Sequence, residues 1–297
     1  ITTYGPKQGP NPSGKFTMYE MDTDQFGMVR IIVSGGGNKG EQYEKEFEAK
    51  AKANVGKPND KLPNDLKTLY DALGIDNTEL KAEDIKFEGN KDTKRSLDLS
   101  GPQPIGETIS DITITYDGEK YYVSLKNVAG SGVYSGPNVP FIYEKDGKVI
   151  YDESKKNSNP SIALLFDIFN IDSQKLADGL NEYMNKEGTE GSWSKTEIDT
   201  DKFKKLLSSS LGYGYYYVRE TKPGEVKVVP LLTAEDASKA VGDITNTEIK
   251  YPGPNTKQLT MKIDTNSPIF GPSQYQVSVR NTSGKLLPLS LRISKTK

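Results

Sequence analysis

Cysteine and histidine are both absent from this chain of 297 residues. Without cysteine there is no thiolate nucleophile, no disulfide framework and no Cys/His zinc site. Without histidine, catalysis of the Ser-His-Asp and Cys-His types is excluded, as is any imidazole general base. An enzyme of this composition would have to work with carboxylates, Lys, Tyr, Ser or an oxygen-liganded metal. Mg²⁺ and Mn²⁺ are the metals that suit such ligands.

Long apolar runs and a large excess of one charge are missing as well. No window comes near the roughly 18 consecutive apolar residues that suggest a membrane helix, so we expect no membrane partner. The net charge of −2 argues against a protein that coats nucleic acid, although 39 Lys and Arg residues leave room for a local basic cleft. The chain starts at Ile1 rather than Met, which is compatible with a processed or trimmed amino terminus.

The residues that are present are typical of a loop-rich globular protein. An apolar content of 34%, together with 17 Tyr, makes the chain too apolar and too aromatic for disorder. Residues 1–27 contain a Gly/Pro-rich stretch and are expected to form an extended arm. Residues 28–150 are expected to form a core domain. Residues 151–297 are expected to form an α+β extension, either packed with the core as one unit or separated at a soft boundary near residues 152–160.

The order of strand-like and helix-like segments predicts a protein of the α+β (mixed α/β) class. A strand is expected near residues 28–34, and Thr233 is a good N-cap for a short helix. The expected helices are EQYEKEFEAKAKANVG, LPNDLKTLYDALGI, SIALLFDIFN, SQKLADGLNEYMNK, DTDKFKKLLSSSL and TAEDASKAVG. The other expected strands lie in residues 110–127, FIYEKDGKVIYDE, YGYYYVRE, EVKVVPLL, QLTMKID, YQVSVRN and LPLSLRIS.

The stretch SDITITYDGEKYYVSLKN, residues 110–127, predicts a β-hairpin around the Asp117-Gly118 turn signal. A two-residue loop would set Asp111 opposite Ser124, whereas a four-residue loop would set it opposite Lys126. Either register puts these three side chains on one face, because side chains alternate along a strand. The simplest interpretation is a cross-strand ion pair at the end of a sheet.

Acidic residues follow the Gly-rich segment GGGNKG that precedes the first expected helix. The segment matches GxGxxG but lacks the Walker A spacing, and the acids would repel a phosphate, so we expect a strand-to-helix turn here. Glu44 lies beside Tyr43 and Phe47, which would share the buried face of the helix. Its carboxylate could therefore point along the rim of a core, although most such Glu residues are solvated.

Three segments, in their order along the chain, resemble the PD-(D/E)xK nuclease superfamily. They are GEQYEKEF, SDITITY with Asp111, and YYVSLK, which ends at Lys126. That superfamily has a helix acid, then an Asp at a strand start, then (D/E)xK on the adjacent strand. The resemblance, which covers roughly residues 28–130, implies a restriction-endonuclease-like core sheet flanked by helices. It also implies Mg²⁺ or Mn²⁺ as cofactor and DNA as substrate. The implied metal ligands are Asp111, Glu44 and the carbonyl of Leu125, and Lys126 would orient or activate the attacking water.

Ser124 is also a candidate catalytic residue, and it occupies the position of the second acid of the motif. Ser110 occupies the position of the Pro that precedes the motif's first Asp. Some members of the superfamily have SxK here and recruit a displaced carboxylate, for which Glu44, Glu48 and Glu144 are the candidates. A decayed site that binds DNA without cutting is the alternative that Ser124 suits.

The stretches YYVSLKN, LGYGYYYVR and YQVSVRNTSGKLLPLSLRIS also resemble uncharacterised bacteriophage proteins. This resemblance fits a virus-encoded nuclease acting in the infected bacterial host. It equally fits a non-catalytic virion or assembly protein whose hairpin carries only a structural ion pair. The partners would then be phage structural proteins or a second copy of the chain.

Two further groups of residues each allow a functional and a structural interpretation. The run Tyr213, Tyr215, Tyr216 and Tyr217 could stack on bases, but packing in a half-buried strand is favoured, and the second ExK, Glu225 and Lys227, is expected to be structural. The closing segment carries cations with only neutral residues between them, which predicts either a phosphate-facing strand pair or protection of an edge strand. These are Arg280, Lys285, Arg292, Lys295 and Lys297, the first three being the candidate nucleic-acid contacts.

Overall fold

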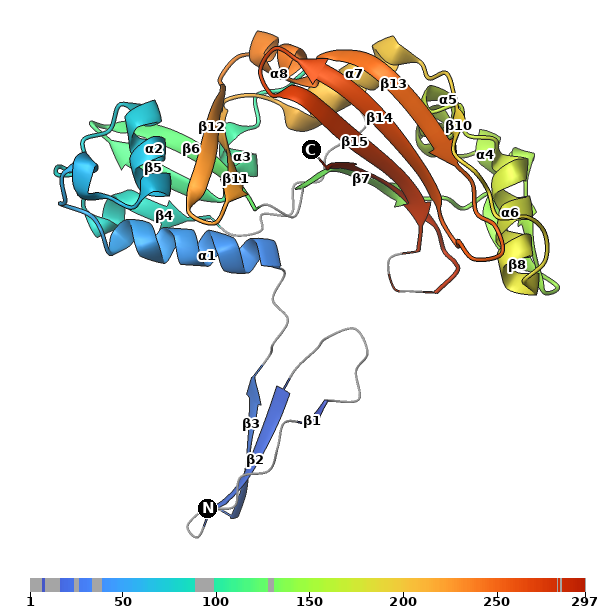
Figure 1. Ribbon diagram of the computed structural model, residues 1–297, viewed down its shortest axis with the longest axis horizontal. Helices are drawn as coiled ribbons and strands as arrows, with labels where there is room; N and C mark the ends of the chain where they lie inside the picture. The colour runs from blue at the N-terminus through green and yellow to red at the C-terminus, as the bar shows by residue number, and fades with distance from the viewer. Residues whose placement is uncertain are drawn as a thin grey trace.

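The computed structural model describes residues 40–88, 99–127, 132–281, 283 and 285–296, and the backbone of residues 7–8, 17–23, 27–33, 39 and 131. The chain has the predicted α+β class, and its described strands form four sheets (Figure 1). A three-stranded sheet near the amino terminus has the order β1-β2-β3. Its strands are β1 (Lys7–Gln8), β2 (Thr17–Thr23) and β3 (Gly27–Val33).

The first large sheet has the strand order β12-β11-β6-β5-β4. Strands β4, β5 and β6 form an antiparallel series, β11 pairs with β6 in parallel, and β12 returns antiparallel to β11. The bounds are β4 (Ile85–Phe87), β5 (Ile112–Tyr116), β6 (Glu119–Lys126), β11 (Tyr215–Lys222) and β12 (Glu225–Leu231).

Helices α1 (Lys39–Lys52) and α2 (Asn64–Leu73) pack on one face of this sheet (Figure 1). The periodic apolar side chains predicted for α2 are buried there, with Leu66 and Leu69 at most 1% exposed. They join Val123 and Leu125 of β6 and Val218 of β11 in one cluster. Shorter helical segments flank this unit, namely η1 (Asn59–Lys61), η2 (Ala82–Asp84) and α3 (Gly106–Ile109).

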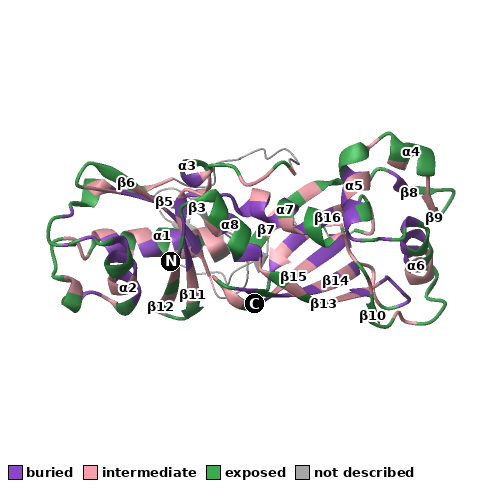
Figure 2. Cartoon of the chain, turned by 90° about the horizontal axis from the view of Figure 1, so that it is seen from above, coloured by how far each residue is buried: buried purple, intermediate pink, exposed green. Residues whose placement is uncertain are grey.

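The second large sheet has the order β10-β13-β14-β15-β16-β7. Buried and more exposed residues alternate along β14 (Figure 2), as expected for a strand with one covered face. The bounds are β7 (Ser131–Asn138), β10 (Ser194–Lys195), β13 (Asp243–Lys250), β14 (Leu259–Ser267), β15 (Gly271–Arg280) and β16 (Ser290–Lys295).

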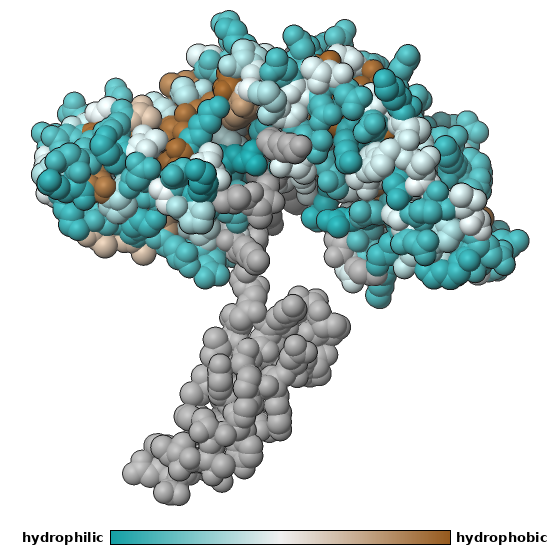
Figure 3. Space-filling view, viewed as in Figure 1, coloured by the Kyte–Doolittle hydropathy of each residue, from teal (hydrophilic) through white to brown (hydrophobic). Residues whose placement is uncertain are grey.

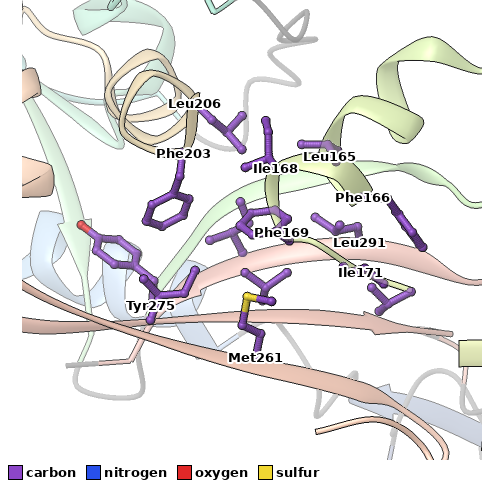
Figure 4. Close-up of a cluster of buried hydrophobic side chains, with 14 of the residues drawn as sticks. Leu165, Phe166, Ile168, Phe169, Ile171, Phe203, Leu206, Met261, Tyr275 and Leu291 are labelled. Carbon is purple, nitrogen blue, oxygen red and sulfur yellow. The ribbon is translucent and has the colours of Figure 1, made fainter. Parts of the chain in front are cut away.

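The covered face of the second sheet packs against helices. Phe166 and Phe203 lie over the sheet side chains Met261, Tyr275 and Leu291 (Figure 4), and all five are fully buried. The helices in this part of the chain are α4 (Glu153–Asn157), α5 (Pro160–Ile168), α6 (Ser173–Asn185), α7 (Thr200–Leu211) and α8 (Ala234–Val241). A two-stranded ribbon, β8 (Ile142–Lys145) with β9 (Lys148–Tyr151), precedes them.

Helix starts follow the local sequence closely. Asp152, Asp172 and Asp199 each accept a hydrogen bond from a backbone N–H of the helix that they precede. Thr233 does the same for α8 and forms a capping box with Asp236, which confirms the predicted N-cap.

Six of the described strands lie where no strand was predicted: the short strands β1, β4 and β10 and the longer strands β2, β7 and β13. β7 has a Gly-rich sequence without apolar alternation, and it is an edge strand of its sheet, a position in which Pro137 is tolerated. The sequence of β13 (DITNTEIK) has no apolar alternation, and most of its side chains are half-exposed, so burial does not require one. β2 lies within the segment expected to be an extended arm.

Both large sheets combine strands from the two sides of residue 150. The first takes β11 and β12 from the second half of the chain, and the second takes β7 from the first half. Tyr215 and Tyr217 of β11 also belong to the same buried cluster as Met261 and Tyr275 of the second sheet. The two halves of the chain are therefore interleaved around shared strands.

Candidate active site

The hairpin of β5 and β6 is closed by a two-residue turn. Asp117 and Gly118 have φ values of 50° and 78°, as a type I′ turn requires and as an Asp-Gly pair favours. The register pairs Ile112 with Val123, so Asp111 lies opposite Ser124. Of the two registers considered from the sequence, the one with the short loop is therefore present.

Groups of Ser124, Leu125 and Lys126 all contact one carboxylate oxygen of Asp111. Its Oδ2 accepts hydrogen bonds from the backbone N–H of Leu125 at 2.6 Å and the hydroxyl of Ser124 at 3.2 Å. The Nζ of Lys126 lies 3.3 Å from the same oxygen, and the Asp111 side chain is 12% exposed. The backbone N–H of Asp111 donates to Val123 O at 2.8 Å, which holds the residue at the strand start.

Glu44 is buried at the rim of α1, and for this residue the solvated interpretation is wrong. It is 7% exposed, and its Oε2 has no hydrogen-bond partner. Burial and, to a smaller extent, the Asp111 carboxylate raise the pKa of Glu44 to about 7, against the opposing effect of the Lys126 ammonium. These electrostatic effects show that α1 brings Glu44 near the Asp111–Lys126 pair.

The other acids of α1 behave as ordinary surface residues. Glu41 pairs with Lys45 and Glu48 with Lys52, each at 2.7 Å. Phe47 is buried because the helix turns this face toward the sheet, and Tyr43 lies against it with ring centroids 6.2 Å apart. Glu44 lies on the edge between these two faces.

The remaining candidates for a displaced acid lie elsewhere. Glu48 is engaged with Lys52, as described above. Glu144 is an exposed residue of β8 in the separate two-stranded ribbon.

Glu88 is an acid near Asp111 that the sequence analysis missed. It follows β4 directly, and its backbone N–H donates to Asp111 O at 2.9 Å. The register Phe87–Ile112, continued by one residue, sets Glu88 opposite Asp111 on the same face of the sheet. Its side chain is 7% exposed and lies 3.7 Å from Lys86 Nζ. The three-residue strand before it is too short to be recognised from hydrophobic alternation.

The donor set suits a hard divalent cation in its chemistry. Asp111 and Glu44 provide carboxylates, and the unpartnered Oε2 of Glu44 is a buried oxygen that a cation would satisfy. Within the part of the chain that the structure describes, no group of three or more Asp, Glu, His or Cys lies close enough together to hold a metal. A metal would therefore have to draw on the Leu125 carbonyl and on water as well.

Of the three candidate nucleic-acid contacts, Arg280 and Arg292 lie on the second sheet, and Lys285 lies in the connection between β15 and β16. Arg280 and Lys285 are exposed, and Arg292 is half-buried between Ser278 and Ser135 on the neighbouring strands. The edge-protection interpretation is wrong, because β16 pairs with both β15 and β7. Lys295 does not share the exposed face either: it is 2% exposed. Lys297 is outside the described residues.

The tyrosine run is explained largely by packing, as favoured from the sequence. Tyr215 and Tyr217 are 1% and 4% exposed in the core, and Tyr216 packs on the opposite face beside Tyr121. In the second ExK, Glu225 pairs with Lys222 at 3.5 Å, so the sequence match does not form a second acidic site. The glycines of GGGNKG before Gly40 lie outside the described residues.

Comparison of this chain with family models, curated proteins and solved structures gave no match. Among the described residues, no helix has the length and apolar character needed to cross a membrane. Viewed as in Figure 3, the surface of the described residues is mostly hydrophilic.

Proposed function

We propose that this protein is a metal-dependent nuclease of the PD-(D/E)xK type that hydrolyses DNA phosphodiester bonds. One observation carries the proposal: the strand-start acid Asp111 and the strand-end cation Lys126 form an ion pair at 3.3 Å, and both charges act on the buried helix acid Glu44. These are the three positions at which the PD-(D/E)xK resemblance expects them. The α+β fold and the short hairpin register support it.

Each residue has a role in this chemistry. Asp111, Glu44 and the Leu125 carbonyl would hold Mg²⁺ or Mn²⁺. When bound, the ion would acidify the attacking water and offset the charge that grows on the phosphate. The Lys126 ammonium would orient that water and favour its deprotonation. Ser124 would keep the Asp111 carboxylate in place through the 3.2 Å hydrogen bond.

The second acid of the motif would come from another element, because Ser124 occupies its usual position. Glu44 is the first choice, since burial and the nearby Asp111 charge already make its ionised form costly without a cation. Glu88 is the second choice, because it lies opposite Asp111 on the neighbouring strand. Glu44 lies on α1 and Glu88 directly follows β4, so a single substitution at each position distinguishes the two candidates.

A second function is favoured by a different observation. All three donors around Asp111 converge on the single oxygen Oδ2, which makes the cluster self-sufficient as a structural ion pair. On that basis the chain would be a non-catalytic virion or assembly protein, binding a second copy of itself or other phage structural proteins. Such a protein would be indifferent to EDTA.

The deciding experiment is cleavage of plasmid and linear DNA with Mg²⁺ or Mn²⁺. Asp111→Asn and Lys126→Met are compared with Asp117→Asn and Lys120→Met, the same exchanges at exposed positions of the same hairpin. We expect the first pair to lower the rate by about 10²–10⁴-fold, the range for groups that act in the transition state. The control pair should cleave like the unaltered chain, and EDTA should abolish cleavage.

The other outcomes are equally informative. DNA retained in a gel shift without cleavage would indicate a decayed nuclease that only binds. Absence of both cleavage and binding would overturn the nuclease and leave the structural protein. If Glu44→Gln cleaves normally whereas Glu88→Gln does not, Glu88 is the second acid.

A further inference from the structure

A cavity of about 280 Å³ is formed by residues of the β11–β12 hairpin and of the second sheet. Three of its lining residues are cations, namely Arg219 on β11, Lys227 on β12 and Lys295 on β16. We call this cavity the cationic pocket. Tyr217 and Phe270 form an aromatic wall, with ring centroids 5.2 Å apart in an edge-to-face arrangement.

The three cations come from different strands but converge on this cavity. Arg219 and Lys227 are directly paired across β11 and β12. Lys295 belongs to the buried face of β16 and donates a hydrogen bond to the Ser273 hydroxyl. In the described chain, neither Arg219 nor Lys227 forms an ion pair with an acidic residue.

Among the lining residues that the structure describes, the one carboxylate is that of Glu220. Its Oε1 accepts a long hydrogen bond of 3.4 Å from Gly224 N, and its charge acts on the Tyr43 hydroxyl on α1, raising the pKa of that tyrosine. The described lining of the cationic pocket therefore has three basic side chains and one carboxylate.

Such an arrangement is costly without a counter-ion. Burial, together with the charges of Arg219 and Lys227, lowers the pKa of Lys295 to about 7. Like charges repel more strongly where protein replaces water around them. An anion in the cavity would reverse this effect and would be held by all three cations.

We propose that the cationic pocket binds the phosphate monoester of a single nucleotide unit. A phosphate monoester carries close to two negative charges near neutral pH and presents several acceptor oxygens, which suit one Arg and two Lys. The aromatic wall of Tyr217 and Phe270 would contact the sugar or base. At about 280 Å³ the cavity is near the lower end of ligand pockets, so it suits one nucleotide rather than a duplex.

The pocket lies beside the candidate active site. Arg219 pairs with Lys126 across the parallel strands β11 and β6, so the two side chains share a face of the sheet. Adjacent strands are about 4.8 Å apart, so the row of Lys126, Arg219 and Lys227 spans roughly 10 Å across β6, β11 and β12. Asp111 lies next to this row, with its Oδ2 3.3 Å from Lys126 Nζ. A strand whose terminal phosphate occupies the pocket would extend toward Asp111. That last step rests on the proposed nuclease function, whereas phosphate binding does not.

The test is calorimetric titration of the full chain in EDTA with thymidine 5′-monophosphate, thymidine, and a short oligonucleotide with or without a 5′-phosphate. We expect the monophosphate to bind and thymidine not to bind. Arg219→Gln and Lys227→Gln should each weaken binding by about tenfold or more, as expected for loss of a charge-assisted hydrogen bond. Lys222→Gln, at an exposed Lys of the same hairpin, should bind like the unaltered chain.

A second readout does not depend on a folded variant. The pKa of Lys295, followed by NMR of its side-chain carbon next to the ammonium group, should rise when the monophosphate is added. Equal binding of the free nucleotide and the phosphorylated strand would identify a nucleotide pocket, and tighter binding of the strand would identify a strand-end pocket. Absence of phosphate-dependent binding, or binding unchanged in both Gln variants, would overturn the proposal. Phosphate binding without any DNA cleavage would retain the pocket and remove the nuclease.

Discussion

Glu44 is the ionisable residue whose environment differs most from that of its neighbours on α1. The folded chain holds its proton up to about pH 7, whereas an unfolded Glu releases it near pH 4.5. The folded state therefore binds more protons between these values, and the free energy of unfolding falls as the pH rises through them. Above pH 7 the ionised carboxylate destabilises the metal-free fold.

Two outcomes are expected from this at Glu44. Without metal, Glu44→Gln should raise the free energy of unfolding at about pH 8 by roughly 1–3 kcal/mol, with little effect near pH 4. Urea unfolding at both pH values measures this, with Glu46→Gln as the exposed control on the same helix. In the unaltered chain, Mg²⁺ should lower the pKa of Glu44, which NMR titration follows. A pKa that stays near 7 in saturating Mg²⁺ would remove Glu44 from the ligand set.

Helix α3 is positioned by a close approach of two backbones. A Cβ on Gly106 would lie 2.2 Å from Gly214 O, at the start of β11, and Ile105 N donates to Tyr213 O at 2.9 Å. The helix ends at Ile109, two residues before Asp111. The contact between α3 and β11 therefore fixes the direction in which the chain enters β5.

Gly106→Ala should accordingly separate α3 from β11. We expect a loss of unfolding free energy of about 1–3 kcal/mol, as for overpacking in a tight contact. DNA cleavage should also decrease because Asp111 moves. Gly132→Ala is the matched control, since a Cβ there meets no atom within 4 Å. Stability is measured by thermal unfolding. If both variants are as stable as the unaltered chain, the contact between α3 and β11 accommodates an added methyl group and the prediction is wrong.

The interleaved sheets make a prediction for the whole molecule. A fragment of residues 40–150 keeps β4, β5 and β6 but loses β11, whose Val218 is fully buried beside Leu125 of β6. We expect this fragment to lack a cooperative unfolding transition. Without β11, strand β6 becomes an edge strand and loses part of the apolar contacts that bury its side chains. Circular dichroism and amide NMR dispersion, compared with the 40–297 chain, test this. A fragment that unfolds cooperatively would show that residues 40–150 form an independent domain.

Much of the local structure could be predicted from the sequence. The Asp117-Gly118 turn, the Thr233 cap and the apolar stripe of α2 depend on interactions within a few residues, so local patterns suffice for them. The meeting of Asp111, Ser124 and Lys126 on one face was predictable for the same reason. Side chains alternate along a strand, and a short turn sets the register.

Only the tertiary structure revealed the rest. The burial of Glu44, the position of Glu88 opposite Asp111 and the convergence of Arg219, Lys227 and Lys295 depend on elements distant in sequence. Likewise β13 and β7 carry too little apolar alternation to be recognised, and they are strands because neighbours in the sheet supply their hydrogen bonds. Local hydrogen bonding and periodicity are encoded in short segments, whereas burial and electrostatic environment arise only when distant segments pack together.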